Sequence, residues 1–459
     1  MIEDLSEYYR TPEGFLHDIP VAMQSGNEGF FRLRSGAVGY GPCATGVSLN
    51  FEEAPLCRAL ANQLPWDPPR TIKNLRHERY EKSLTPAREK TLSQEWSLKA
   101  YYFVRDSLPT SARQCLQRIY FSDWKKRPFP AWPVDFTVDA IHERLLQLSM
   151  EAAGLRRVPF IWFWPEGAAN CLILTHDVET CAGRAFTFQL MDLDESRHLR
   201  ASFQVIPEKR YEVPPEYVRE IRNRGFEFNI HDLNHDGRLY RDRDEFLRRA
   251  KKINGYIHLY GAKGFRAGVM YRNLDWYDAY EFSYDMSMPN VAHLDATHGG
   301  CCTVFPFFVG RILELPLTTS QDYSLFYILK DYSIDLWKKQ LDVIRRKNGL
   351  MSFLAHPDYL ICLRNRRVYQ HLLDYLFEMV SQENVWHALP GEVDRWWRTR
   401  SQLRLIKRRG EWEIEGQGKE RARIAYAVLD GNRLVYEVAS HGAPALHGYG
   451  FSTSPAPPA

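Results

Sequence analysis

The chain lacks the features that mark membrane, nucleic-acid-binding and disulfide-rich proteins. Its purely apolar stretches fall well short of the roughly 20 residues that span a bilayer, and residues 1–9 have neither the positive start nor the apolar core of a signal peptide. The 60 Lys+Arg nearly balance the 57 Asp+Glu, and no basic stripe indicates nucleic acid. The eight cysteines form no CxxC pair, so no disulfide framework is indicated. We expect a cytoplasmic protein with no membrane span and no nucleic-acid partner.

At 459 residues the chain is long enough for more than one domain. Residues 1–155 are rich in Pro, Arg and aromatics, which predicts an N-terminal α+β accessory region of unknown role. Residues 156–399 alternate strand-like and helix-like patterns and predict the main domain. Residues 400–450 predict a small β meander with a turn at Asp430-Gly431. Residues 451–459 contain three prolines and are predicted to be disordered.

The main domain has the pattern of an α/β protein. Amphipathic stretches predict helices at 215–224, 242–259, 334–346 and 368–380. Apolar runs between them predict strands at 159–164, 171–177, 201–206, 226–231, 264–268, 282–286, 311–317 and 350–356. Strands separated by helices indicate parallel βα units, arranged either as an open sheet or as a barrel.

Polar residues stand where several of these strands end. They are Asp177, Glu179, His231, His235, Arg266, Asp285 and His356. Because parallel strands share one carboxyl edge, we expect these side chains to lie close together. The spacing of the two histidines, if they stand on one helical turn, points both rings the same way. Two imidazoles and one carboxylate leave an open position on a zinc-like ion, as a catalytic metal requires.

These blocks resemble the motifs of the polysaccharide deacetylase family (NodB homology domain, carbohydrate esterase family 4). Thr175-His-Asp-Val-Glu179 resembles the family's Thr-Phe-Asp-Asp motif in a divergent form, and His231-Asp-Leu-Asn-His235 resembles its His-(Ser/Thr)-x-x-His motif. Its arginine, aspartate and Leu-x-His motifs have counterparts at Gly264–Gly268, Tyr284–Ser287 and Leu354–Pro357. The resemblance covers about 165–395 and implies an irregular (β/α) barrel of about seven strands.

The resemblance also implies a set of site residues and a cofactor. The cofactor expected is a divalent metal, most simply zinc, with cobalt or nickel as alternatives, and its predicted ligands are Glu179, His231 and His235. Asp177 is the predicted general base, held ionised by Arg266, and His356 is the predicted proton donor to the leaving amine. Asp285 is a further catalytic candidate whose partner stays open.

The first motif leaves one alternative open. Val178 separates Asp177 from Glu179 where the family has adjacent aspartates. Side chains two residues apart on a strand point the same way, so both carboxylates can serve one site. In the alternative arrangement Asp177 binds the metal, and Glu179 contacts a ligand instead of the metal itself.

The predicted reaction is removal of an acetyl or other acyl group from an N-acetylated sugar or related carbohydrate intermediate, in polysaccharide biosynthesis or modification. Two alternatives are a hydrolase of another non-peptide C–N bond and a metal- and sugar-binding barrel without turnover. An HD-type phosphohydrolase is disfavoured because its ligands come from helices. Asp322 follows a strand and is a possible substrate contact. The sequence does not indicate an oligomeric state.

Overall fold

The computed structural model describes residues 2–439 except 23–25, 59, 61–62, 85–120, 122–123 and 432. The predicted disordered tail at 451–459 lies outside these residues. The chain forms two compact units, each made of separate segments. Unit 1 comprises Met1–Ile19, His142–Gly167 and Arg398–Ala459, and unit 2 comprises Pro20–Ile141 and Ala168–Trp397. No helix in the described part of the chain is long and apolar enough to cross a membrane.

Unit 2 contains a curled sheet of nine strands that is open on one side. The strand order is β11-β4-β5-β6-β7-β8-β10-β9, and β12 also pairs with β4. All neighbouring strands are parallel except β9 and β10. The bounds are β4 (Asn170–Val178), β5 (Ser202–Val205), β6 (Glu227–His231), β7 (Gly264–Arg266), β8 (Tyr284–Asp285), β9 (Phe307–Val309), β10 (Ile312–Glu314), β11 (Leu350–Ala355) and β12 (Val385–His387).

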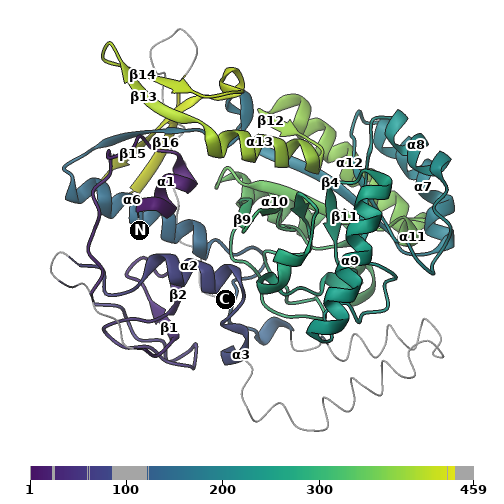
Figure 1. The fold of residues 1–459 in the computed structure, drawn as a ribbon, viewed down its shortest axis with the longest axis horizontal. Helices are drawn as coiled ribbons and strands as arrows, with labels where there is room; N and C mark the ends of the chain where they lie inside the picture. The colour runs from purple at the N-terminus through teal and green to yellow at the C-terminus, as the bar shows by residue number, and fades with distance from the viewer. Residues whose placement is uncertain are drawn as a thin grey trace. The chain divides into compact units, whose positions relative to one another are not determined.

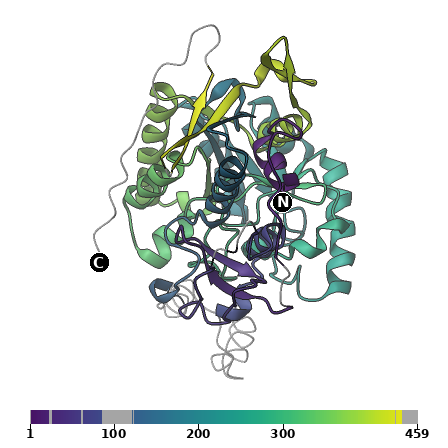
Figure 2. The same cartoon turned by 90° about the vertical axis from the view of Figure 1, so that its left-hand side faces the viewer.

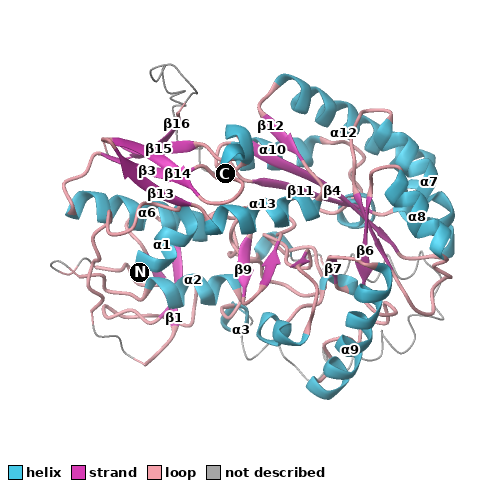
Figure 3. Cartoon of the chain, turned by 45° about the horizontal axis from the view of Figure 1, so that its top comes forward, coloured by secondary structure: helices cyan, strands magenta, loops and turns pink. Residues whose placement is uncertain are grey.

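This half-barrel confirms the predicted α/β fold class (Figure 3). The sheet has nine strands rather than about seven because the short strands β9 and β12, which the apolar pattern does not mark, join it. Every residue of β4 is buried, as is typical of a parallel strand covered on both faces. Thr175 of β4 pairs with Ser202 of β5 on one side and with Leu354 of β11 on the other. The carboxyl ends of these strands therefore meet at one edge.

Helices connect the strands of unit 2 and lie beside the sheet (Figures 1 and 3). The four predicted helices are confirmed as α8 (Pro215–Asn223), α9 (Arg243–Tyr260), α10 (Asp335–Arg345) and α12 (Leu363–Gln382). The others along this part of the chain are α7 (Cys181–Glu195), α11 (Pro357–Leu360) and α13 (Pro390–Gln402). Thr180 caps α7 by accepting hydrogen bonds from the amides of Ala182 and Gly183. This cap ends the segment after β4 and fixes the backbone that carries Glu179.

The N-terminal part of unit 2 has its own small elements (Figures 1 and 2). The antiparallel pair β1 (Gly29–Arg32) and β2 (Val38–Gly41) is followed by α2 (Pro68–Arg76) and α3 (Glu81–Leu84). The helix α6 (Thr137–Ala152) begins in unit 2 and continues into unit 1. Asn74 of α2 donates a hydrogen bond to the carbonyl of Tyr40 at 3.3 Å. Residues 20–141 and the half-barrel belong to one compact unit by their contacts along the chain.

Unit 1 combines strands from distant parts of the sequence. The strand β15 (Ile424–Asp430) pairs antiparallel with β16 (Arg433–Val438) and with β3 (Arg157–Ile161), whereas β13 (Arg404–Arg408) pairs with β14 (Glu411–Glu415). The assignment of 159–164 to the parallel sheet is therefore wrong. Pro159 lacks an N–H, and β3 is an edge strand, where proline is tolerated. The predicted meander divides into two hairpins because β14 does not pair with β15.

Candidate metal and hydrolytic site

Glu179, His231 and His235 converge at the carboxyl edge of the sheet. Glu179 follows β4, His231 ends β6, and His235 lies in the loop beyond β6. Oε1 of Glu179 is 3.1 Å from Nε2 of His235 and 4.0 Å from Nε2 of His231. One ligand atom from each residue lies within 4.8 Å of the other two. The structure thus brings together the three residues predicted as metal ligands.

The two histidines do not share a helical turn, contrary to the reasoning from their spacing. The residues after His231 form a loop in which Asp232 and His235 both have φ of 54°. The Asp232 amide donates a hydrogen bond to the Arg266 carbonyl at 2.8 Å, which ties this loop to β7. Left-handed backbone at two positions folds the loop back, and the imidazole centroids end 4.9 Å apart.

The donor atoms of this cluster fit a divalent cation. Among the described residues, Nε2 of His231 and Nε2 of His235 are buried and form no hydrogen bond of normal geometry, although Oε1 of Glu179 lies 3.1 Å from Nε2 of His235. Nδ1 of His231 lies 3.0 Å from the Arg266 carbonyl, which can only accept, so Nδ1 carries the proton, and in the neutral ring Nε2 has the lone pair that a cation needs. Two imidazole nitrogens beside a carboxylate are the donor set of zinc and similar ions.

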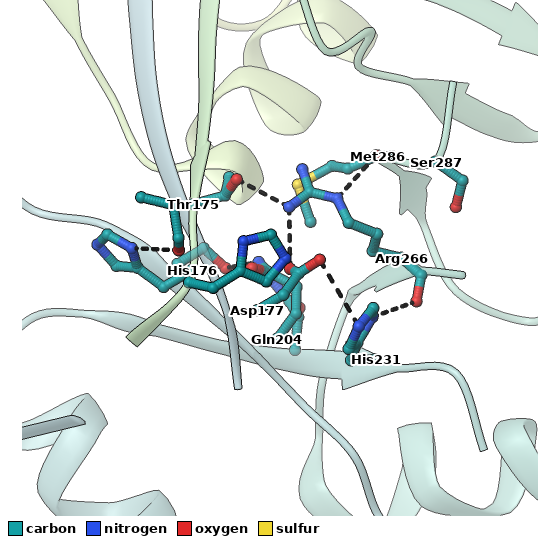
Figure 4. A network of polar contacts seen from close by, with 12 residues as sticks. Thr175, His176, Asp177, Gln204, His231, Arg266, Met286 and Ser287 are labelled. Atoms are coloured by element: carbon teal, nitrogen blue, oxygen red, sulfur yellow. Dashed lines mark hydrogen bonds and ion pairs between the residues drawn. The ribbon is translucent and has the colours of Figure 1, made fainter. Parts of the chain in front are cut away.

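Asp177 is held beside the cluster by a buried arginine (Figure 4). Nη1 of Arg266 donates to Oδ1 of Asp177 at 3.0 Å, and Oδ2 of Asp177 is 3.7 Å from Nε2 of His231. Arg266 also donates to the Thr175 hydroxyl and the Met286 carbonyl, each at 2.8 Å. Burial raises the pKa of Asp177, but Arg266, together with His231 and His356, outweighs burial and lowers that pKa below its usual value. Asp177 is therefore an ionised carboxylate facing the cluster.

His356 approaches the cluster from β11 and is oriented by Asp322. Oδ1 of Asp322 lies 2.6 Å from Nδ1 of His356, and Oδ2 accepts the His356 amide at 2.8 Å. Nε2 of His356 is 3.7 Å from Oε1 of Glu179. Burial favours the neutral ring, but Asp322, with smaller contributions from Glu179 and Asp177, raises the pKa of His356 to about 10. The imidazole is thus a charged donor whose Nε2 faces the site.

Asp285 is not among the contact partners of the cluster within the described residues. Its carboxylate accepts from the Tyr277 hydroxyl at 2.7 Å and from the amide and hydroxyl of Ser287 at 2.9 Å each. Ser287 in turn accepts the Ala267 amide at 2.8 Å, next to Arg266. Asp285 is therefore linked through Ser287 to the backbone beside Arg266, and its predicted catalytic role stays a prediction.

Sequence reasoning missed two carboxylates that shape the site. The sequence predicts Asp322 only as a substrate contact, because no motif marks it as the partner of His356. Asp358 accepts the Glu179 amide at 3.1 Å and also a hydrogen bond from the Thr180 hydroxyl, so it fixes the backbone of Glu179. Asp358 stands just beyond β11, whereas Asp322 lies in the longer segment after β10, so position relative to a strand is only a weak signal for the latter.

No protein-family model and no curated protein matches the chain. Among solved structures, a candidate polysaccharide deacetylase from Mycobacterium smegmatis matches with 18% identity and a TM-score of 0.43. The match covers 55% of this chain and 98% of the deacetylase chain. The Puue allantoinase matches with 13% identity and a TM-score of 0.40, over 51% of this chain and 92% of its own. The peptidoglycan deacetylase PdaC from Bacillus subtilis matches with 15% identity and a TM-score of 0.33, over 51% and 94%. At these identities and TM-scores the matches assign the chain to no family and to no substrate.

Proposed function

We propose that the protein is a metal-dependent hydrolase that removes an acetyl or other acyl group from the nitrogen of a sugar or related carbohydrate intermediate. The observation that carries this proposal is the gathering of three kinds of group at one sheet edge. They are the candidate cation ligands, the arginine-held carboxylate of Asp177, and the imidazole of His356 with its Asp322 partner. A site that only binds a metal needs neither a base nor a proton donor.

Each group has a defined task in amide hydrolysis. A divalent cation held by Glu179, His231 and His235, when bound, polarises the acyl oxygen and makes water more acidic. Asp177 accepts the proton of the attacking water, because Arg266 keeps it ionised while Oδ2 faces the cluster. The leaving nitrogen then needs a proton before the C–N bond breaks.

His356 supplies that proton from Nε2. Its Nδ1–H is engaged by Asp322, so only Nε2 faces the reacting groups. Asp322 also stabilises the imidazolium form, which keeps the donor charged at neutral pH. The base and the acid face different ligands of the cluster: Asp177 lies beside His231, and His356 lies beside Glu179.

A sugar substrate is supported by aromatic rings beside His356. The ring of Tyr359 lies 4.9 Å from the His356 ring, and those of Tyr323 and Tyr327 lie 5.5 and 5.1 Å from Tyr359. All three tyrosines are half-buried. Aromatic faces with polar edges suit the mixed apolar and polar surface of a sugar ring.

The test combines metal content with product release. Purified protein is analysed for zinc, cobalt and nickel and assayed for acetate release from N-acetylglucosamine and its oligomers. The wild type is compared with the His231→Ala/His235→Ala double variant. Metal near one equivalent together with acetate release, both lost in the variant, is the expected result. Metal without release from any N-acyl sugar or amide would instead favour the non-catalytic metal- and sugar-binding barrel.

A further inference from the structure

The backbone after Arg266 adopts an unfavourable conformation next to the site. Residues Ala267–Tyr271, called here the site turn, include Val269 and Met270 with φ of 60° and 54°. A β-branched residue rarely adopts positive φ, because its side chain collides with its own backbone. Such conformations persist only where the surroundings hold them in place.

The site turn and the residue before it contact both histidines of the cluster. The Arg266 carbonyl is 3.0 Å from Nδ1 of His231. At Gly268 an added Cβ would lie 2.5 Å from Oδ2 of Asp232 and 2.9 Å from Cδ2 of His235, so the turn is packed directly against the His235 ring. Met270 belongs to a buried apolar cluster with Leu317 and Leu354. Any shift of this turn therefore displaces the ligands of the proposed cation.

A buried arginine side chain, that of Arg272, is hydrogen-bonded to the backbone of the site turn. Nη1 of Arg272 donates to the Met270 carbonyl at 2.7 Å. Its Nη2 also reaches the carbonyls of Thr297 and His298, at 3.4 Å each. Arg272 thus ties the turn to the 297–298 loop through three main-chain oxygens.

Glu78, which follows α2 in the N-terminal part of the chain, is the counter-charge of this arginine. Its carboxylate accepts from Nε of Arg272 at 2.8 Å and from Nη2 at 2.5 Å, in a two-pronged contact. The side chain of Glu78 is only 11% exposed and that of Arg272 only 1%, so water cannot replace the carboxylate. Burial opposes the charge of Arg272, yet Glu78 raises the pKa of its guanidinium above the usual value.

We propose that Glu78 is a positioning residue of the hydrolytic site: through Arg272 it holds the strained site turn against the two metal-ligand histidines. The segment around residues 63–84 is then part of the catalytic apparatus rather than an accessory region. This inference rests on the proposed hydrolase function.

The test compares two partly buried carboxylates that each accept more than one hydrogen bond. Glu78→Gln keeps the size of the side chain but leaves Arg272 without its counter-charge. Glu227→Gln is the matched control, because Glu227 begins β6 at the end opposite His231 and accepts bonds from Asn229, Tyr284 and Gly391. Thermal stability, metal content, kcat/KM and hydrogen exchange of the amides of 267–272 are measured for each. Glu78→Asp, which restores the charge, tests for rescue.

We expect both glutamine variants to lose thermal stability, whereas only Glu78→Gln speeds amide exchange in the site turn. Its kcat/KM should fall about tenfold to a hundredfold, the range seen when partners of metal ligands are removed, and Glu78→Asp should recover part of it. Equal effects of the two variants on exchange and on kcat/KM, at equal loss of stability, would overturn the proposal.

The two hypotheses fail in different ways. If the wild type releases no acyl group from any N-acyl sugar or amide, the hydrolase function is refuted, and exchange in the site turn still decides whether Glu78 holds it. If Glu78→Gln does not fold, Arg272→Lys takes its place, since it keeps the charge but cannot bridge the carboxylate and the Met270 carbonyl with one planar group. Unchanged amide exchange and unchanged turnover in that variant would contradict the proposed role of Glu78 and Arg272.

Discussion

Removing the carboxylate of Asp322 should shift the pH dependence of turnover without removing the cation site. Asp322 is the largest contributor to the elevated pKa of His356, which stands at about 10. The protonated imidazole is the proton donor in the proposed reaction, so activity falls as the pH rises through this value. In Asp322→Asn the remaining neighbours Glu179 and Asp177 raise the pKa less, and it moves towards the ordinary value of 6.5.

The size of the effect follows from the protonated fraction. With a pKa of about 10, nearly all His356 is protonated at about pH 8.5. With a pKa near the ordinary histidine value, about one molecule in a hundred is protonated at that pH. Because Glu179 and Asp177 remain, we expect kcat in Asp322→Asn to fall about tenfold to a hundredfold at about pH 8.5 and much less at about pH 6.

The assay is acetate release measured across pH, with metal content determined for every sample. Asp242→Asn, which removes the charge of the residue that caps α9 and touches no site residue in the described structure, is the control and should keep the wild-type profile. If the profile of Asp322→Asn has the wild-type shape at all pH values, His356 is not the proton donor.

Three further results are expected. Asp177→Asn should keep its metal while kcat falls roughly a hundredfold to ten-thousandfold, as on loss of a general base; parallel loss of metal and activity would instead make Asp177 a ligand. Burial, together with Asp285, raises the pKa of Glu314 well above its ordinary value, so the folded protein holds this proton more tightly than the unfolded chain. The stability that depends on this bound proton is present at low pH and is lost as the pH rises through the folded pKa. Glu314→Gln should therefore melt above the wild type in alkaline but not in acidic buffer. Identical melting curves in alkaline buffer would contradict this. Gly268→Ala, whose new Cβ would lie 2.5 Å from Asp232, should cost about 1–3 kcal/mol of stability and weaken metal binding in a titration, unlike Gly255→Ala, where no atom lies within 4 Å.

The sequence was most informative where local pattern and topology coincide. The apolar runs that became β4, β6 and β11 are long enough to identify, and parallel pairing places their carboxyl ends at one edge. That rule alone brought Asp177, Glu179 and His231 into one place. It also put Asp285 at the same edge, where the structure shows it bonded to Tyr277 and Ser287 instead.

The rest depended on contacts that leave no local signal. Asp322 and His356 are 34 positions apart, and Glu78 and Arg272 are 194 apart, so no spacing or periodicity links either pair. The loop from His231 to His235 turns by left-handed residues that are not glycine, and the spacing of four residues therefore suggested a helix. The apolar run at β3 matches a barrel strand in composition, and only its partner β15 reveals the other sheet.

Unit 1 is built from segments that are far apart in the sequence, and this affects the order in which the protein folds during synthesis. Its central strand, β15, pairs with β3, which is made more than 260 residues earlier. The Tyr9 hydroxyl meets that of Tyr436 at 2.7 Å, and Arg400 donates to the carbonyls of Tyr8 and Ile161. Domains tend to fold as they leave the ribosome, so the half-barrel can form while β3 still waits for its partner. A message broken before the codon for Ile424 would therefore yield a chain with an exposed edge strand and unmatched aromatic rings, a substrate for chaperones and proteases.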